Sequence, residues 1–509
     1  ITKTSGTVYT FTPKIGLPRT ALSEIKVNGT AIAGYDPNKY AYVVNVNNPV
    51  GEQPMIEYPS LGDVIVEHVI ENSKHVQLKV TDTNEPAHPT KTYDVYFYYP
   101  SDVIPNGEFE NWTGTVYNGA SKPTEWAAPA DVAEKYTTTS TYYTGKEVSK
   151  SGNYLSLKSY WKDAVLVGEG NNFSIAGTIP GMITTGKISL TLAGWGGSTS
   201  SVNEFTDFRN TPDFATLRYN PVSTKKIKNI RAIYTFVDED NTTKELIFTD
   251  SEFNNTWKTA ESSLISKNLV APKSFRITLN AAHTENASDL GGVSGNYYSS
   301  EMLVDYVRFK YSSTLTNIVI DGVSNSVTNN YTIDADYQGI PAISAVGEVP
   351  DQEHTIQIAE TETESGANML RAVTINSKAE DGTSTNYSFN IVRPKSSNNQ
   401  LKGIKINGIA LADFEPNKLV YSYTVANGTT RTPDIEAICG SMHQRIKINT
   451  NGINTATIVV TPENGSATTY SINFVEEKSD VATLKEITIE GNPADFAFDE
   501  NISEYNVAL

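Results

Sequence analysis

An eight-residue phrase occurs four times in this chain and constrains its fold more than any other feature. The phrase has the form L-x-x-I-x-[VI]-x-G, and its copies lie at residues 22–29, 315–322, 401–408 and 484–491. Apolar and polar residues alternate through its second half, as they do in a strand with one buried face, and the final Gly permits a tight turn. A phrase repeated at regular distances predicts a tandem array of small domains.

A second recurring mark gives the length of the repeat. Tyr93, Tyr387 and Tyr470 each lie in a strand-like run, 71, 72 and 69 residues after the first Leu of a phrase. The next phrase begins 14 residues after Tyr387 and 14 after Tyr470, so a complete unit has about 85 residues. The first two phrases, however, begin 293 residues apart, which leaves about 208 residues for a different domain between the first and second full units.

Each unit contains short strand-like runs that alternate with turn residues. In the first unit the runs are 24–27, 41–46, 55–58, 64–69, 76–81 and 93–98. The turn Asp36-Pro37-Asn38 returns in the third unit as Glu415-Pro416-Asn417, and its Pro presets the backbone for a corner. Six or seven strands in a unit of this length predict an antiparallel β-sandwich of immunoglobulin type.

Composition supports an all-β protein and excludes several classes. Tyr, Thr and Val are abundant, which favours strands. The net charge is −18 and no basic stripe with interleaved aromatic residues occurs, so nucleic-acid binding is disfavoured. No apolar run reaches the roughly 18 residues of a transmembrane helix. The single cysteine, Cys439, cannot form an internal disulfide and is expected to be a buried thiol.

The predicted architecture is all-β: tandem immunoglobulin-like β-sandwiches, with one larger jelly-roll β-sandwich inserted between the first and second full repeats. The predicted domains are the closing strand of a preceding repeat (1–14), a repeat (15–101), the jelly roll (102–312), two more repeats (313–395 and 396–478) and the start of a truncated repeat (479–509). The two broken units favour a fragment of a longer array. The alternative is a subunit that donates a strand to its neighbour in a filament.

On the phrase and on the closing strand around Tyr387, the units resemble bacterial cadherin-like β-sandwich repeats. The resemblance implies spacer domains in an exported protein. Cadherins hold calcium between domains through acidic patterns such as D-x-N-D-N, and these do not occur in this sequence. The junction 393–399 is short and contains a Pro, so neighbouring repeats are expected to form a semi-rigid rod.

The insert differs from the repeats, because all five Trp of the chain lie in it. Its strand-like runs predict a jelly roll of about eight to ten strands. It opens with N-G-x-F-E at 106–110, and a V-D-x-V strand at 304–307 closes it, with the segments 123–126, 178–181 and 213–219 between them. On these segments the insert resembles carbohydrate-binding jelly rolls, above all a provisionally named carbohydrate metabolism domain of secreted proteins of gut Bacteroidetes.

The resemblance implies a glycan or polysaccharide partner and an extracellular, outer-membrane-associated location at the bacterial cell surface. In related jelly rolls, the Glu of the F-E pair and the Asp of the final strand hold a structural calcium ion. The corresponding residues here are Glu110 and Asp305, and carbonyls near 151–153 would complete the shell that Ca²⁺ requires. Alternatively, the two carboxylates bond loop amides or an Arg.

Two Trp are candidates for stacking on a sugar ring. Trp161 and Trp195 lie where strand-like runs meet charged or glycine-rich loops, and we expect them to face solvent. Arg209, Asp213 and Arg218 could bond the sugar hydroxyls. The other Trp receive structural roles: core positions for Trp112 and Trp126, and the anchor of a strand start for Trp257.

No constellation in the insert indicates catalysis. A glycoside hydrolase needs two carboxylates on opposite sides of the scissile bond, and no spacing singles out a pair among the many acidic residues. Neither H-E-x-x-H nor G-x-S-x-G occurs, and the acidic run 238–242 is expected to be a hairpin turn. The sequence therefore favours glycan binding without cleavage. A structural adhesin or surface-filament protein, which binds other surface proteins or copies of itself, is the first alternative, and a glycoside hydrolase is the second.

Overall fold

The computed structural model of the chain describes residues 20–60, 62, 64–84, 90–113, 121–128, 131, 147–167, 173–179, 181–193, 197–202, 205–223, 229–263, 265, 269–283, 300–478, 485–487, 498–499 and 501–505. The predicted closing strand at 1–14 and most of the predicted unit at 479–509 lie outside them. The chain divides into two compact units. The first comprises Ile1–Val327, Ala342–Gln357 and Thr374–Tyr387, and the second Thr328–Pro341, Ile358–Val373 and Ser388–Leu509.

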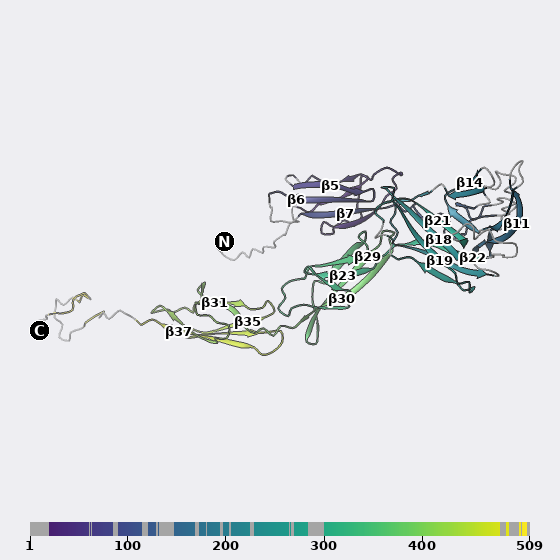
Figure 1. Ribbon diagram of the computed structural model, residues 1–509. Coiled ribbons are helices and arrows are strands. Elements are labelled where there is room, and N and C mark those ends of the chain that lie inside the picture. The colour runs from purple at the N-terminus through teal and green to yellow at the C-terminus, as the bar shows by residue number, and fades with distance from the viewer. Residues whose placement is uncertain are drawn as a thin grey trace. The chain divides into compact units, whose positions relative to one another are not determined.

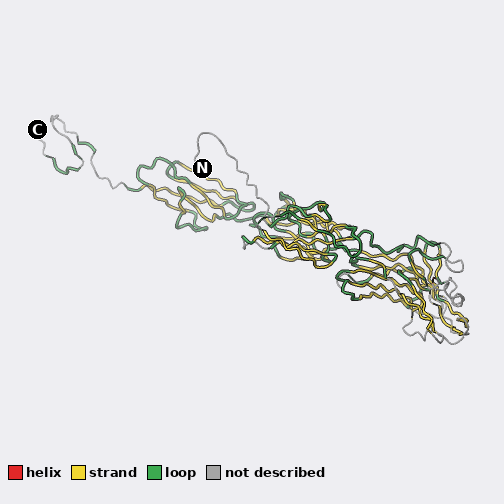
Figure 2. The backbone as a smooth tube through the Cα atoms, turned by 90° about the horizontal axis from the view of Figure 1, so that it is seen from above, coloured by secondary structure: helices red, strands yellow, loops and turns green. Residues whose placement is uncertain are grey.

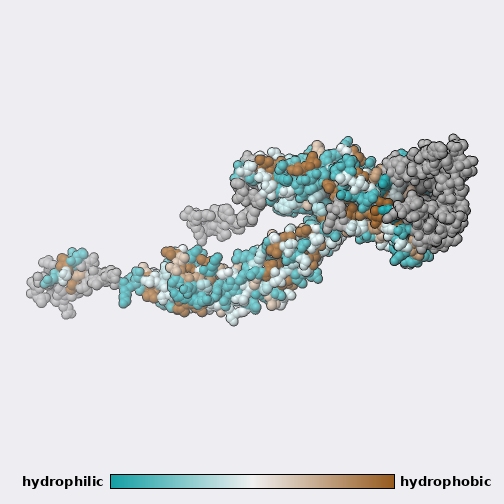
Figure 3. Space-filling view, viewed as in Figure 1, coloured by the Kyte–Doolittle hydropathy of each residue, from teal (hydrophilic) through white to brown (hydrophobic). Residues whose placement is uncertain are grey.

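The described elements are β-strands, arranged as stacked sheets in the repeats and in the insert (Figures 1 and 2). The protein is thus all-β, with immunoglobulin-like sandwiches before and after a larger jelly-roll sandwich along the chain, as the sequence predicts. On the face seen in Figure 3, the coloured residues form a mixed surface in which hydrophilic areas alternate with smaller hydrophobic patches. In the part of the chain that the structure describes, no helix is long and apolar enough to span a membrane.

The first repeat packs two sheets around one core. A three-stranded sheet has the order β2-β1-β4 and a four-stranded sheet the order β3-β7-β6-β5. The strands are β1 (Lys26–Val27), β2 (Thr30–Ala31), β3 (Ala41–Asn45), β4 (Ile56–Glu57), β5 (Val64–Asn72), β6 (His75–Asp82) and β7 (Lys91–Tyr98). The alternating residues Val76, Leu78 and Val80 of β6 are fully buried between the sheets, as strand periodicity requires.

The second and third full repeats reproduce this plan. The second has sheets β24-β23-β26 and β25-β30-β29-β27, and the third has β32-β31-β34 and β33-β37-β36-β35. Their strands are β23 (Leu315–Ile320), β24 (Val323–Ser326), β25 (Asn330–Thr332), β26 (Ile343–Gly347), β27 (Glu353–Ile358), β28 (Thr363–Ser365), β29 (Asn368–Lys378), β30 (Ser384–Pro394), β31 (Leu401–Ile406), β32 (Ile409–Ala410), β33 (Val420–Val425), β34 (Ile435–Cys439), β35 (Arg445–Asn451), β36 (Thr455–Thr461) and β37 (Thr468–Glu476).

The prediction of purely antiparallel sandwiches is wrong at one pairing in each repeat. Strand β3 runs parallel to β7, β25 to β30 and β33 to β37. In the first repeat, the chain leaves the first sheet through the Asp36-Pro37-Asn38 turn and enters the second sheet beside its last strand. That crossover makes β3 run in the same direction as β7, and a parallel pair needs such a crossover connection.

The insert packs a five-stranded sheet, β20-β17-β22-β10-β9, on a six-stranded sheet, β19-β18-β21-β13-β8, in which β16 also pairs with β21. The strands are β8 (Trp126–Ala127), β9 (Val148–Ser151), β10 (Tyr154–Lys158), β13 (Met182–Thr185), β16 (Thr206–Asp207), β17 (Phe214–Ser223), β18 (Asn229–Asp238), β19 (Thr243–Asp250), β20 (Lys258–Glu261), β21 (Pro272–His283) and β22 (Ser300–Lys310). Two further hairpins, β11 (Tyr160–Val167) with β12 (Phe173–Ile179) and β14 (Ile188–Ala193) with β15 (Gly197–Val202), bring the described strands of the insert to fifteen, more than the expected eight to ten. Two-residue strands such as β8 and β16 add to the excess, because no sequence pattern reveals strands so short.

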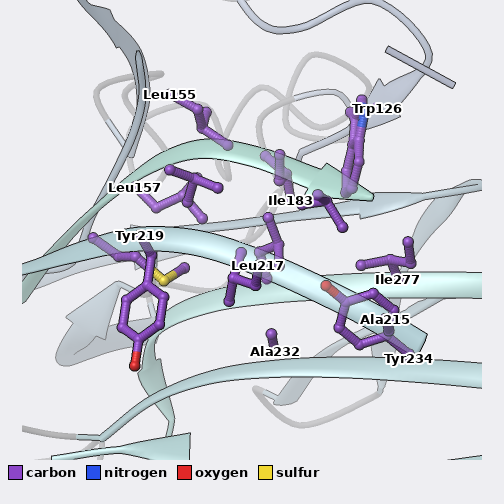
Figure 4. Packing of buried hydrophobic residues seen from close by; sticks show 14 of the residues in the cluster. Trp126, Leu155, Leu157, Ile183, Ala215, Leu217, Tyr219, Ala232, Tyr234 and Ile277 are labelled. Carbon is purple, nitrogen blue, oxygen red and sulfur yellow. The ribbon is translucent and has the colours of Figure 1, made fainter. Parts of the chain in front are cut away.

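Residues from both sheets meet in the core of the insert (Figure 4). Leu155, Leu157 and Leu217 of the five-stranded sheet face Tyr234 and Ile277 of the six-stranded sheet, and all are buried. Trp126 is also buried, as predicted, and its Nε1 donates to the Pro105 carbonyl at 2.9 Å. Trp112 is half-buried against the same core.

Two local expectations have opposite outcomes. The run 238–242 is a hairpin turn between β18 and β19, closed by the Asp238 amide donating to the Thr242 carbonyl at 2.9 Å, which confirms the prediction. Cys439 is exposed instead of buried. Its strand β34 pairs with β31 through a register shift between Leu401 and Gly403. This irregularity breaks the simple alternation, so an apolar residue type does not fix burial there.

Candidate functional site

An exposed ion pair marks the outer face of the five-stranded sheet. Leu217 and Tyr219 of β17 point into the core, so Arg218 between them points outward. Its Nε lies 3.0 Å from Oδ2 of Asp305, and the two side chains are 44% and 36% exposed. Strand β22 bulges at this point, since Arg218 pairs with Tyr306 while Tyr219 pairs with Val304. The bulge turns Asp305 towards Arg218.

Two aromatic rings adjoin this ion pair. The ring centroids of Tyr154 and Trp257 are 4.6 Å apart with an interplanar angle of 50°, and the Arg218 guanidinium lies 5.6 Å from the centroid of the Trp257 ring. Both aromatic side chains are partly exposed. A cation over an aromatic face is attracted by the electron-rich ring, so the Arg and Trp side chains support one another.

The loop before β20 brings Trp257 onto this face. Asn255 adopts a left-handed backbone conformation, with φ of 54°, which Asn tolerates better than most residues. Its amide donates to the Pro221 carbonyl at 3.0 Å, and its Oδ1 accepts from Nδ2 of Asn220 at 3.1 Å. The loop is therefore fastened to β17, and Trp257 follows two residues later.

Asn220 carries a buried side-chain acceptor that the described part of the chain does not hydrogen-bond. It lies on the same face of β17 as Arg218 and is 6% exposed. Among the described residues, its Oδ1 has no hydrogen-bond partner. A buried acceptor without a donor is unfavourable, so such a group in a native protein calls for a ligand or water. We call Tyr154, Arg218, Asn220, Trp257 and Asp305 the outer-face cluster.

A second polar network supports the cluster from the edge of the sheet. The Tyr219 hydroxyl and the Lys258 ammonium donate to Oδ2 of Asp250 at 2.8 and 2.6 Å. Burial alone would raise the pKa of Asp250, but the hydrogen bonds from Lys258, from the Glu252 amide and from Tyr219 outweigh it, so the pKa lies below its usual value. Asp250 therefore stays ionised and ties the end of β19 to the start of β20.

Arg209 and Asp213 have partners at the ends of the insert and not in the outer-face cluster. Arg209 binds Asp102 through Nε and Nη2, both at 2.9 Å, and its guanidinium lies 3.7 Å from the centroid of the Tyr99 ring. Asp213 is 2% exposed, and its Oδ2 accepts from the Ser312 amide at 2.6 Å. Of the polar residues predicted to contact a ligand, only Arg218 belongs to the cluster.

The two Trp predicted to stack on a sugar stay predictions. Trp161 lies in β11 (Tyr160–Val167), where its backbone pairs with Thr178 of β12 (Phe173–Ile179), and its side chain is outside what the structure describes. Trp195 lies outside the described residues, between β14 (Ile188–Ala193) and β15 (Gly197–Val202). Trp257 was predicted to anchor a strand start, and it directly precedes β20, which begins at Lys258. Its proximity to Tyr154 and Arg218 was not predicted, because those residues lie on other strands.

The predicted calcium site at Glu110 and Asp305 also stays a prediction. Glu110 is exposed, whereas Asp305 pairs with Arg218, as the alternative interpretation expected. Within the described residues, no group of three or more His, Cys, Asp or Glu side chains is placed to hold a metal ion.

Comparisons with known proteins give remote likenesses. No protein-family profile matches the chain, and no curated protein matches it. Solved structures similar to it include the M60 catalytic domain with the CBM51-1 and CBM51-2 domains of Clostridium perfringens ZmpB (9% identity, TM-score 0.16, 88% of this chain and 48% of that chain). The extracellular domain of protocadherin GammaB4 is another (9% identity, TM-score 0.13, 81% and 71%). The N-terminal eight Ig domains of DSCAM isoform 1.30.30 are a third (9% identity, TM-score 0.10, 89% and 70%).

The chain thus spans about half the length of the ZmpB structure. These TM-scores are too low for the similarities to indicate a function. The function proposed below therefore rests on the geometry of the outer-face cluster.

Proposed function

We propose that this chain belongs to an extracellular or cell-surface multidomain protein whose jelly roll binds a glycan or polysaccharide without cleaving it. The observation that carries the proposal is the outer-face cluster, which combines two partly exposed aromatic rings with a guanidinium, a carboxylate and an amide oxygen that no described residue hydrogen-bonds. The immunoglobulin-like repeats act as spacers that present this module. The resemblance of the insert to carbohydrate-binding jelly rolls supports the same substrate class.

The chemistry of the cluster suits a sugar. The C–H-bearing face of a pyranose packs on an aromatic ring such as Trp257, which buries apolar area without a deep pocket. Arg218 donates hydrogen bonds, Asp305 accepts them, and the free Oδ1 of Asn220 accepts one more. Sugar hydroxyls both donate and accept, so one saccharide could satisfy all three groups at once.

The cluster is less suited to hydrolysis. A glycosidase places two carboxyl groups on opposite sides of the bond that it breaks, about 5–10 Å apart. The cluster contains a single carboxylate, Asp305, which pairs with Arg218. We therefore keep hydrolysis, like the role of structural adhesin or filament protein, as an outcome of the test.

The proposal is tested by screening the full chain against immobilised polysaccharides. We expect Trp257→Ala and Arg218→Ala to weaken glycan binding at least tenfold, the effect of losing about 1.4 kcal/mol. Arg308→Ala is the matched control, because Arg308 belongs to the same sheet, pairs with Glu108 at 2.5 Å and lies 3.9 Å over the Tyr306 ring, yet it is outside the cluster.

Equal losses in all three variants, or no binding by the wild-type chain to any polysaccharide, would overturn the proposal. Release of sugar, abolished by a single carboxylate substitution, would favour the hydrolase. Concentration-dependent polymerisation without glycan binding would favour the filament protein.

A further inference from the structure

The last strand of the second repeat carries a buried arginine where the repeat ends. Arg393 follows Tyr387 by six residues, just before the junction at Pro394. It is 2% exposed although it is charged. Charged side chains are rarely so buried unless they are fully paired. The partners of Arg393 therefore indicate how the second and third repeats are held together at this junction.

Two carboxylates, one from the second repeat and one from the third, bind the Arg393 guanidinium. Glu362 of the second repeat accepts from Nε at 3.2 Å and from Nη2 at 2.7 Å. Glu463 of the third repeat accepts from Nη1 at 2.7 Å and from Nη2 at 3.0 Å. Nη1 also donates to the Ala335 carbonyl at 3.1 Å. The planar guanidinium thus makes a two-point contact with a carboxylate on each side of the joint, an arrangement that fixes orientation as well as distance.

Further hydrogen bonds surround Arg393, Glu362 and Glu463, which together we call the clamp. The Ser396 amide donates to Oε2 of Glu463 at 3.0 Å, and the Ser396 hydroxyl bonds Asp336. Nε2 of His443 lies 2.9 Å from the Tyr337 carbonyl. The pKa of Glu362 and that of Glu463 both lie below the usual range, chiefly because each accepts hydrogen bonds from Arg393. Both carboxylates therefore stay charged and remain paired with Arg393.

A guanidinium also lies where the first repeat meets the insert, but there its carboxylate partner belongs to its own domain. Tyr99 follows Tyr93 by six residues and so stands where Arg393 stands in the second repeat. The guanidinium that meets it comes from the neighbouring domain: Arg209 makes its two-point contact with Asp102, lies over the Tyr99 ring, and donates through Nη1 to the Asn48 carbonyl at 2.5 Å. Each joint thus contains a guanidinium bound at two points to a carboxylate, but of the two only Arg393 binds carboxylates from both neighbouring domains.

We propose that the Arg393 guanidinium acts as a fixed cation that holds the joint between the second and third repeats, so that this joint stays stiff without a divalent metal ion. A cation between carboxylates of neighbouring domains prevents their repulsion and limits their relative motion. A guanidinium performs this role permanently, because it is never deprotonated in proteins and its fork of donors matches carboxylates in one geometry. Loss of the arginine would leave two carboxylates facing one another across the joint.

The joint at Arg393 can be tested with the exposed thiol of Cys439, the single cysteine of the chain. A second thiol at the exposed position Ala372, introduced as Ala372→Cys, allows spin labels to be placed on the second and third repeats of the full chain. We expect a narrow distribution of distances between the labels, unchanged by EDTA or by added Ca²⁺. Arg393→Ala should broaden it at least twofold, and Arg393→Lys should broaden it less.

Lys395→Ala is the matched control, because Lys395 is a neighbouring cation that pairs with Glu364 of the same repeat, and it should leave the width unchanged. Glu463→Gln removes one side of the clamp and serves in place of Arg393→Ala if that variant does not fold. A width that stays unchanged in both clamp variants, or one that EDTA broadens in the wild-type chain, would overturn the proposal.

Discussion

Each repeat is closed by one tyrosine hydroxyl. In the third repeat the buried Tyr470 hydroxyl accepts from the Leu401 amide at 3.1 Å and donates to the Pro416 carbonyl at 2.7 Å. Tyr93 makes the same two contacts in the first repeat, with Leu22 and Pro37. The hydroxyl thus ties the first residue of the phrase to the turn that leads into the second sheet, which explains the nearly constant spacing from phrase to Tyr.

We predict that Tyr470→Phe destabilises the third repeat by about 1–3 kcal/mol, because it leaves a backbone amide and a carbonyl without partners. Hydrogen exchange of peptides around Leu401 in the full chain would show the effect as faster exchange. Tyr423→Phe is the control, since Tyr423 is half-buried and touches Phe474 through its ring. Equal protection in the two variants would contradict the role given to the Tyr470 hydroxyl.

At the scale of elements, the phrase encodes a strand and the hairpin turn that follows it. Asn407 and Gly408 both have positive φ, 50° and 81°, as do the equivalent residues of the other described phrases. Two consecutive positive φ values define the type I′ turn that suits a twisted hairpin. The position before the Gly in the phrase is thus not free, although the sequence alone left it open.

We predict that Gly408→Ala destabilises the third repeat by about 1–2 kcal/mol, the cost of a left-handed conformation for a residue with a Cβ. No atom lies within 4 Å of a Cβ added there, so the cost is conformational and not steric. Gly408→Asn should cost less, because Asn tolerates this conformation. The urea midpoint of this repeat, followed on peptides that belong to it, would measure the loss of stability in each variant. An equal loss of stability in the two variants would contradict the explanation.

Sequence periodicity predicted the strands well and their partners less well. The runs around β6 and β17 were predicted because alternation is local, whereas the parallel partner of β3 lies some fifty residues away along the chain. The outer-face cluster shows the same limit. Arg218 was predicted as a ligand contact, but Trp257 and Tyr154 approach it through a loop and a separate strand, and a pattern read along the chain does not reveal that approach.

At the scale of the whole molecule, the first and second repeats contact one another directly, although the insert separates them in the sequence. Lys74 of the first repeat is 4% exposed. Its ammonium donates to Thr211 of the insert at 2.9 Å and to Glu380 of the second repeat at 2.5 Å. The Val43 amide also donates to Glu353 at 2.7 Å, across 310 residues of sequence. The expected rod of successive spacers did not include these contacts, because residues so far apart leave no common pattern.

Lys74 therefore links three domains through a buried ion pair. Burial raises the pKa of Glu380 well above its usual value, and the nearby Asp351 adds to this effect, while Lys74 opposes it. Glu380 and Asp351 are both buried, and the negative charge of Asp351 disfavours a second negative charge on Glu380. The folded chain therefore favours the protonated form of the Glu380 carboxyl group.

The sign of the pH dependence follows from this proton. Because the pKa of Glu380 is higher in the folded than in the unfolded chain, its contribution to stability is complete below the unfolded pKa and is lost as the pH rises through the folded pKa. We predict that the first unfolding transition in urea shifts to lower urea concentration as the pH rises from 5 to 8. Glu380→Gln cannot lose a proton, so its transition should change less over the same range. If the urea midpoints of wild type and Glu380→Gln differ by the same amount at every pH, Glu380 does not change its protonation on unfolding. The contact between Lys74 and Glu380 would then be an ordinary ion pair.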